Sequence, residues 1–84
     1  MIQGQRVTVL IDGGATHNFI DSTLITRSGS PTEEFKGFNV EVVDGRTMPC
    51  LRKAPGLKVT LGKYNITNDF YIVDLAYINI VLGV

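Results

Sequence analysis

One acid in this sequence stands where a carboxylate could do chemistry. The apolar residues 9–11 lead into Asp12, and two glycines and an alanine follow it. An acid at the end of a buried strand, with glycines that let backbone come close, is suited to proton transfer. Aspartate and glycine are also among the commonest turn residues, so a solvated turn is the simpler interpretation of this stretch taken alone.

Short strands separated by turn residues are predicted along most of the chain. Asp21-Ser22-Thr23 offers N-cap chemistry for a helix of about one or two turns that ends near Gly29, and Asp44-Gly45 is a strong hairpin signal. Alternating or wholly apolar runs predict strands at residues 6–11, 15–20, 35–43, 46–51, 57–61, 66–75 and 78–84. The fold class is therefore all-β, a small closed barrel or compact sandwich with at most one or two short helices.

Composition limits the class of protein. The 84 residues suffice for one domain, spanning 1–84. Eight basic and eight acidic residues give a net charge of zero, which leaves no electrostatic footprint for nucleic acid or an anionic membrane. No apolar run approaches the roughly 20 residues of a membrane span. Cys50 is the only cysteine, so an internal disulfide is excluded and an intracellular, cytoplasmic setting is expected.

No metal and no cofactor are expected. One cysteine and one histidine cannot fill a zinc site. His17 could act with Asp12 and Asp21 as a metal ligand, but the sequence offers no third nitrogen or sulfur ligand. A partly exposed polar side chain is the simpler interpretation of His17.

Residues 11–20, IDGGATHNFI, resemble the active-site segment of retropepsin-type aspartic proteases. They are similar in particular to the proteases of plant Ty3/gypsy retrotransposons, whose usual form is Asp-Ser-Gly-Ala-Thr-His-Asn-Phe. Later blocks follow in the family's order: Val-Asp-Gly with Met-Pro-Cys at 43–50, Asp-Phe-Tyr-Ile-Val at 69–73, and Ile-Val-Leu-Gly at 80–83. The resemblance covers nearly the whole chain and implies the half-pepsin fold and aspartic endopeptidase activity on a retroelement polyprotein.

The resemblance also implies a homodimer. Two carboxylates a few ångströms apart cannot both ionise comfortably, so they share one proton and supply a base and an acid at the same pH. This chain supplies one such acid, because Asp21, Asp69 and Asp74 lack a following glycine. The second acid is therefore expected from another copy of the chain across a two-fold axis.

Site residues follow from the resemblance position by position. Asp12 is the catalytic acid, and the active-site loop is Gly13, Gly14 and Ala15. Thr16 and His17 fall where the family contacts the backbone of an extended peptide substrate, while Ala15, Phe19 and Val81 fall where it lines subsites. Taken as isolated residues, these last three would simply be core.

A flap, the hairpin that closes over the peptide in this family, is expected to have its tip at residues 52–56. These are Arg52, Lys53, Ala54, Pro55 and Gly56. An ordinary basic loop explains the same residues equally well.

Two departures from the family pattern favour an alternative function. Gly13 stands where the family has a serine or threonine whose hydroxyl bonds across the dimer axis, and losing such a hydrogen bond costs about 1 kcal/mol. The family's further strand before residue 2 and its helix after the final Leu-Gly are also missing, so the chain resembles a core truncated at both ends. The alternatives are a weakened or inactive domain that serves as a dimerisation or peptide-binding module, and a purely structural β domain.

Overall fold

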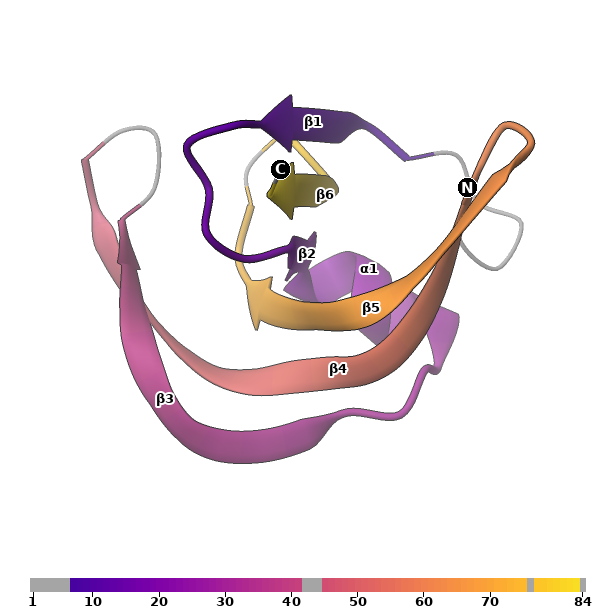
Figure 1. Cartoon of the computed structure of the whole chain (residues 1–84). Helices are drawn as coiled ribbons and strands as arrows, with labels where there is room; N and C mark the ends of the chain where they lie inside the picture. The colour runs from indigo at the N-terminus through magenta and orange to yellow at the C-terminus, as the bar shows by residue number, and fades with distance from the viewer. Residues whose placement is uncertain (1–6, 42–44, 76, 84) are drawn as a thin grey trace.

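A computed structural model describes residues 7–41, 45–75 and 77–83 of the chain. It consists of six strands and one short helix, and the strands form a single sheet that curls strongly into a half-barrel (Figure 1). The predicted all-β class is confirmed. No helix within the described ranges has the length and apolar character that crossing a bilayer requires.

The strand order in the sheet is β1-β6-β2-β5-β4-β3. The elements are β1 Val9–Asp12, β2 Phe19–Asp21, α1 Ser22–Ser28, β3 Glu33–Glu41, β4 Thr47–Leu61, β5 Tyr64–Val73 and β6 Ile80–Gly83. Strand β6 lies between β1 and β2, parallel to the first and antiparallel to the second. The last described strand is thus inserted beside the two strands that flank the Asp12 loop.

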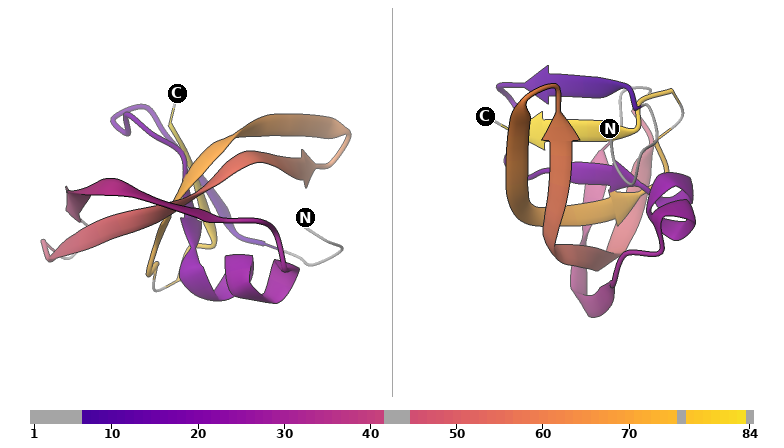
Figure 2. Two further views of the ribbon diagram at one scale, coloured as in Figure 1. Left: turned by 90° about the horizontal axis from the view of Figure 1, so that it is seen from below. Right: turned by 90° about the vertical axis from the view of Figure 1, so that its right-hand side faces the viewer.

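Helix α1 begins and ends where its capping residues require. The Asp21 side chain accepts a hydrogen bond from the Thr23 N–H at 3.1 Å, and Gly29 closes the helix in the left-handed conformation at φ 68°. Leu24 and Ile25 are buried and pack the helix against one side of the curled sheet (Figure 2). The predicted helix is confirmed with both ends.

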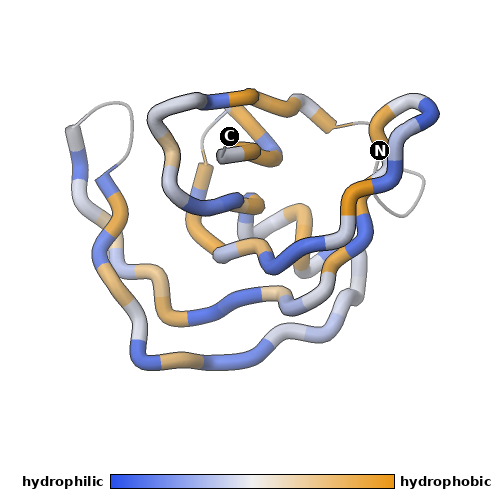
Figure 3. Tube along the Cα trace, viewed as in Figure 1, coloured by the Kyte–Doolittle hydropathy of each residue, from blue (hydrophilic) through white to orange (hydrophobic). Residues whose placement is uncertain are grey.

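The core lies inside the curl. Its largest fully buried side chains are Phe70, Ile20, Ile25, Ile80 and Val59, drawn from four strands and the helix. Polar and apolar segments alternate along the outer strands β3 and β4 (Figure 3), as expected where one face is buried and the other solvated. Burial of these side chains is the main favourable term that holds the curled sheet together.

Strand β4 is longer than the sequence predicts. Residues 46–51 and 57–61 were expected to be separate strands, but Thr47–Leu61 is one continuous strand. At Pro55 and Gly56 its pairing with β5 is interrupted by a bulge, between the pairs Ala54–Phe70 and Leu57–Asn68. A bulge admits a proline because the missing N–H is not needed in the ladder there.

Candidate active site

Asp12 lies at the end of β1, where the chain leaves the sheet. The Gly14 N–H donates a hydrogen bond of 2.8 Å to Asp12 Oδ1, and the Ala15 N–H donates one of 3.2 Å to the Asp12 carbonyl oxygen. Asp12 Oδ2 accepts no hydrogen bond from the residues that the structure describes. The backbone therefore fixes one carboxylate oxygen and leaves the other to a proton, a water or a substrate.

The loop after Asp12 is packed against β6 at Gly83. A Cβ added to Gly83 would lie 2.8 Å from the carbonyl oxygens of both Ala15 and His17, closer than such atoms approach. The Gly83 N–H donates to Asn18 Oδ1 at 2.9 Å, and Gly83 pairs with Asp12 in the β1–β6 register. Glycine at the end of β6 is thus needed because the loop backbone crosses directly over it.

A cleft of about 390 Å³ opens beside Asp12. One wall is the active-site loop, and the opposite wall is the end of β3, at the β3–β4 hairpin that rises beside the loop in Figure 1. The lining residues are Leu10, Asp12, Gly14, Ala15, Thr16, His17, Phe19, Phe38, Asn39, Val40, Glu41, Val73, Leu75, Ile78 and Val81. Every residue predicted to contact substrate lies on this cleft, and their roles with a peptide stay predictions.

Three further aspartates in the described part of the chain make hydrogen bonds within the fold. Asp21 caps α1 and also accepts from the Leu75 N–H at 2.8 Å. Asp74 accepts from the Ser22 hydroxyl, and Asp69 accepts from the Gly56 N–H at 2.9 Å. None of these three lines the cleft, so among the aspartates that the structure describes, Asp12 is the one that is placed to react there.

Comparison with protein families agrees with this geometry. The model of the PEG10/RTL1 protease domain matches residues 8–84, a span that contains Asp12, the loop after it and β6. The chain belongs to this protease domain family. The family is retropepsin-like and derived from retrotransposons. A search of curated proteins and a search of solved structures each returned no match.

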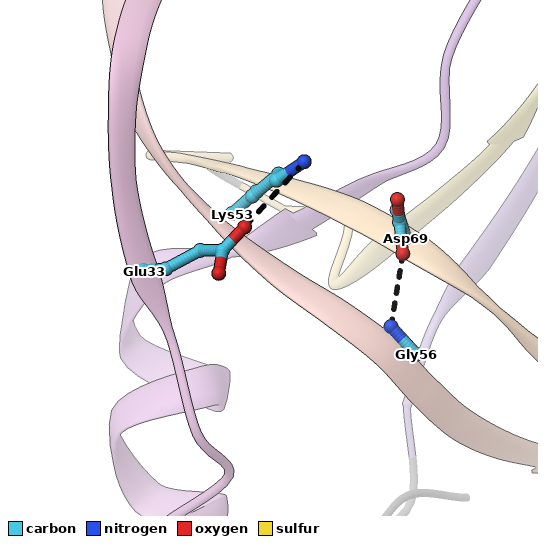
Figure 4. Close-up of polar contacts among 4 residues, drawn as sticks. All are labelled: Glu33, Lys53, Gly56 and Asp69. Atoms are coloured by element: carbon cyan, nitrogen blue, oxygen red, sulfur yellow. Dashed lines mark hydrogen bonds and ion pairs between the residues drawn. The ribbon is translucent and has the colours of Figure 1, made fainter.

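The predicted flap tip is wrong in position. Residues 52–56 lie inside β4 and form no hairpin tip. Lys53 makes an ion pair of 3.5 Å with Glu33 of β3, and the Gly56 N–H donates a hydrogen bond to the Asp69 carboxylate (Figure 4). Proline and glycine mark a turn and a bulge equally well, which is why the sequence misled. The hairpin that walls the cleft is β3–β4, and its turn includes Gly45 at φ 86°; residues 42–44, with the hairpin signal at Asp44, lie outside the described residues.

Gly13 lies beside the cleft but does not line it. A Cβ added to Gly13 meets no atom within 4 Å, and its φ is not in the left-handed region. The position therefore has room for the serine that the family pattern carries. Within one copy of the protease domain, nothing in the described structure requires glycine here.

An aromatic cluster beside the loop was missed by sequence reasoning. It comprises His17, Phe19, Phe35, Phe38 and Tyr71, whose ring centroids lie 5.0–6.3 Å apart in seven pairs. Phe35 and Phe38 are three apart, a spacing that places side chains on opposite faces of a regular strand. The irregularity in β3 between Glu34 and Phe38, with Gly37 at φ 88°, brings both rings to one face.

Asn18 is a further residue that the sequence analysis did not assign. Its side chain accepts from the Gly83 N–H at 2.9 Å and its carbonyl oxygen accepts from the Tyr71 N–H at 2.8 Å. It therefore ties the loop to β6 and β5 at once. The only signal in the sequence is its place in the resemblance, because neither partner is near it in the chain.

Proposed function

We propose that this protein is an aspartic endopeptidase of retroviral type that works as a homodimer. Each copy contributes one Asp12, and the pair activates a water molecule for hydrolysis of an extended segment of a retroelement polyprotein. The observation that supports the proposal most directly is the Asp12 carboxylate, held through Oδ1 by the Gly14 N–H and facing a cleft, in a chain of a protease domain family.

The chemistry follows from two carboxylates sharing one proton. The ionised carboxylate takes a proton from a water molecule while the water oxygen attacks the peptide carbonyl carbon. The protonated carboxyl group donates a hydrogen bond to the carbonyl oxygen. The carboxyl group that took the proton from water then gives it to the amide nitrogen as the C–N bond of the tetrahedral intermediate breaks. The products are a carboxylic acid and an amine, and the two carboxylates again share one proton. The Gly14 N–H fixes the orientation of the Asp12 carboxylate.

The substrate part of the proposal rests on the shape of the cleft. Thr16 and His17 on one wall and residues 38–41 on the other present backbone and side chains along opposite sides. An extended peptide can bind between such walls through strand-like backbone hydrogen bonds. The proposal includes an intracellular setting and a plant Ty3/gypsy-type lineage, which rest on the single cysteine and on the resemblance of residues 11–20.

Asp12→Asn tests the catalytic role. We expect the protein to cleave a peptide library at about pH 4–6, to be inhibited by pepstatin, and to lose at least ~10³-fold of its activity in Asp12→Asn. Asp74→Asn is the matched control, because it makes the same chemical change outside the cleft and should leave cleavage within about twofold. No turnover by the wild type at concentrations where sedimentation demonstrates a dimer would contradict the proposal.

A non-catalytic dimerisation or peptide-binding module is the second candidate, and Gly13 favours it. A hydroxyl at this position would bond across the dimer axis in the family pattern, and the space around Gly13 can accept a serine. If the proposed activity is merely weakened, Gly13→Ser should raise kcat/KM about fivefold or more, since one hydrogen bond per copy is restored. Peptide binding with no cleavage by either form would favour the module.

A further inference from the structure

Three rings join the active-site loop to the opposite wall of the cleft. The His17 imidazole stacks on Phe38 of β3 with centroids 5.2 Å apart and planes 29° apart. The Tyr71 ring of β5 packs T-shaped against both rings, with centroids 5.0 Å from His17 and 5.2 Å from Phe38. His17 and Phe38 both line the cleft, so their stack spans from one wall to the other.

The loop side of this stack is held firmly. Thr16 Oγ1 lies 2.9 Å from His17 Nδ1, which fixes the orientation of the ring. The backbone on either side is tied down, because the His17 carbonyl oxygen lies close over Gly83 and the Asn18 carbonyl oxygen accepts from the Tyr71 N–H. His17 is therefore anchored to the same piece of backbone that carries Asp12.

The hairpin side has fewer constraints. Among the strands that the structure describes, β3 is an edge of the sheet and pairs with β4 alone. Beyond Phe38 the residues Asn39, Val40 and Glu41 form the wall that faces the active-site loop. The position of this wall is consequently set by the β3–β4 ladder and by whatever holds Phe38.

We propose that His17 is a positioning residue: by stacking on Phe38 it ties the β3–β4 hairpin to the active-site loop and sets the width of the cleft beside Asp12. The role of this width in catalysis rests on the proposed function, whereas the contact and its effect on the hairpin do not. Loss of the stack lets the hairpin move away from the loop, so an extended peptide meets only one wall.

Amide hydrogen exchange on the full chain tests this without requiring turnover. We expect His17→Ala to speed exchange in the β3–β4 pairs near the cleft, such as Val40–Met48, by about five- to tenfold relative to the β4–β5 pair Val59–Ile66. His17→Phe keeps a ring for the stack and should return this ratio to within about twofold of the wild type.

Two further variants separate the stack from general stability. Ile25→Val lowers stability in helix α1, which contributes no ring to the stack, and should leave the ratio of the two exchange rates unchanged. Phe38→Leu removes the stack from the hairpin side and should match His17→Ala, and the double variant should add little to either. Phe38→Leu also provides the readout if His17→Ala does not fold.

The outcomes for the inference and for the proposed function are distinct. A ratio that stays at its wild-type value in His17→Ala or Phe38→Leu overturns the inference, whatever the turnover. Where peptide cleavage is measured, loss of the stack should raise KM by about fivefold or more while kcat changes less, because a displaced wall weakens peptide binding first. If the variants exchange faster in the hairpin but the wild type cleaves no peptide, the proposed function is contradicted and the inference is supported.

Discussion

At the scale of single residues, Gly83 shows how the chain brings distant backbone segments together at the site. The carbonyl oxygens of Ala15 and His17 each lie 2.8 Å from where its Cβ would be. Glycine is required by this crossing, and the same crossing holds the loop that follows Asp12. A side chain introduced at position 83 would therefore displace the active-site loop without contacting the Asp12 side chain.

Gly83→Ala is expected to lower the free energy of unfolding by about 1–3 kcal/mol, because the loop backbone must shift to admit a methyl group. Urea denaturation measures this loss. Gly13→Ala is the control, since a Cβ there meets nothing within 4 Å and the change should stay below about 1 kcal/mol. Equal losses in the two variants would show that the close approach at Gly83 is not limiting.

Cys50 makes stability depend on pH at the alkaline end. Its side chain is buried, with Sγ donating to the Ile72 carbonyl oxygen at 3.4 Å, and burial raises the pKa of its thiol above the ordinary value of 9.0. The folded protein thus keeps this proton to higher pH than the unfolded chain does. The stabilisation is fully present below pH 9 and is lost as the pH rises toward the folded-state pKa.

Cys50→Ala should remove that dependence. We expect the wild type to lose unfolding free energy more steeply than the variant in urea titrations between about pH 8 and 10. The variant is less stable at neutral pH because the substitution leaves a small cavity. The comparison is therefore between the slopes of unfolding free energy against pH, and the absolute free energies are not compared. Parallel slopes would mean that the thiol ionises equally in both states.

At the scale of elements, the sequence predicted the helix ends that depend on neighbouring residues but did not predict the pairing register of distant strands. Asp21 and Gly29 stand at the ends of α1, and their side-chain and backbone preferences predicted both ends of the helix. Pro55 and Gly56 have the same local preferences in a turn and in a bulge. What decides between them is Asp69, a residue 13 positions away that binds the Gly56 N–H from the neighbouring strand.

The candidate site divides in the same way. Asp12 and the small residues after it could be predicted, because the motif is contiguous in the sequence. Phe38 and Tyr71 could not, because their place beside His17 depends on how β3, β4 and β5 pair and on the irregularity near Gly37. Pairing between strands is set by the whole core, so no short window of sequence contains it.

The bulge in β4 gives a prediction at this scale. Asp69→Ala removes the acceptor for the Gly56 N–H and should cost about 1 kcal/mol of unfolding free energy, with faster amide exchange at Gly56. Asp69→Asn keeps an oxygen in the same place and should lose less. If both variants behave like the wild type, the bulge is held by the ladder alone.

At the scale of the whole molecule, Asp12, which the proposed function pairs with the Asp12 of a second copy, lies beside an exposed edge of the described sheet. Strand β1 is one edge of the sheet, and Ile11, next to Asp12, leaves 66% of its surface exposed. An exposed, apolar edge strand is a ready site for association with another chain. The neutral net charge of the protein opposes such pairing little.

Ile11→Lys tests whether two copies meet at this edge, as the proposed homodimer requires. A charge on the edge opposes strand association, so the variant should raise the dissociation constant in sedimentation over a concentration series by about tenfold or more. Because Ile11 is exposed, the unfolding free energy of the monomer should change by less than about 0.5 kcal/mol. Tyr64→Lys is the control, because it changes a side chain that is 70% exposed at the start of β5 and should leave association unchanged. An equal effect of both variants on the dissociation constant would place the contact elsewhere. Peptide cleavage by an Ile11→Lys monomer would contradict a pair of aspartates shared between two copies.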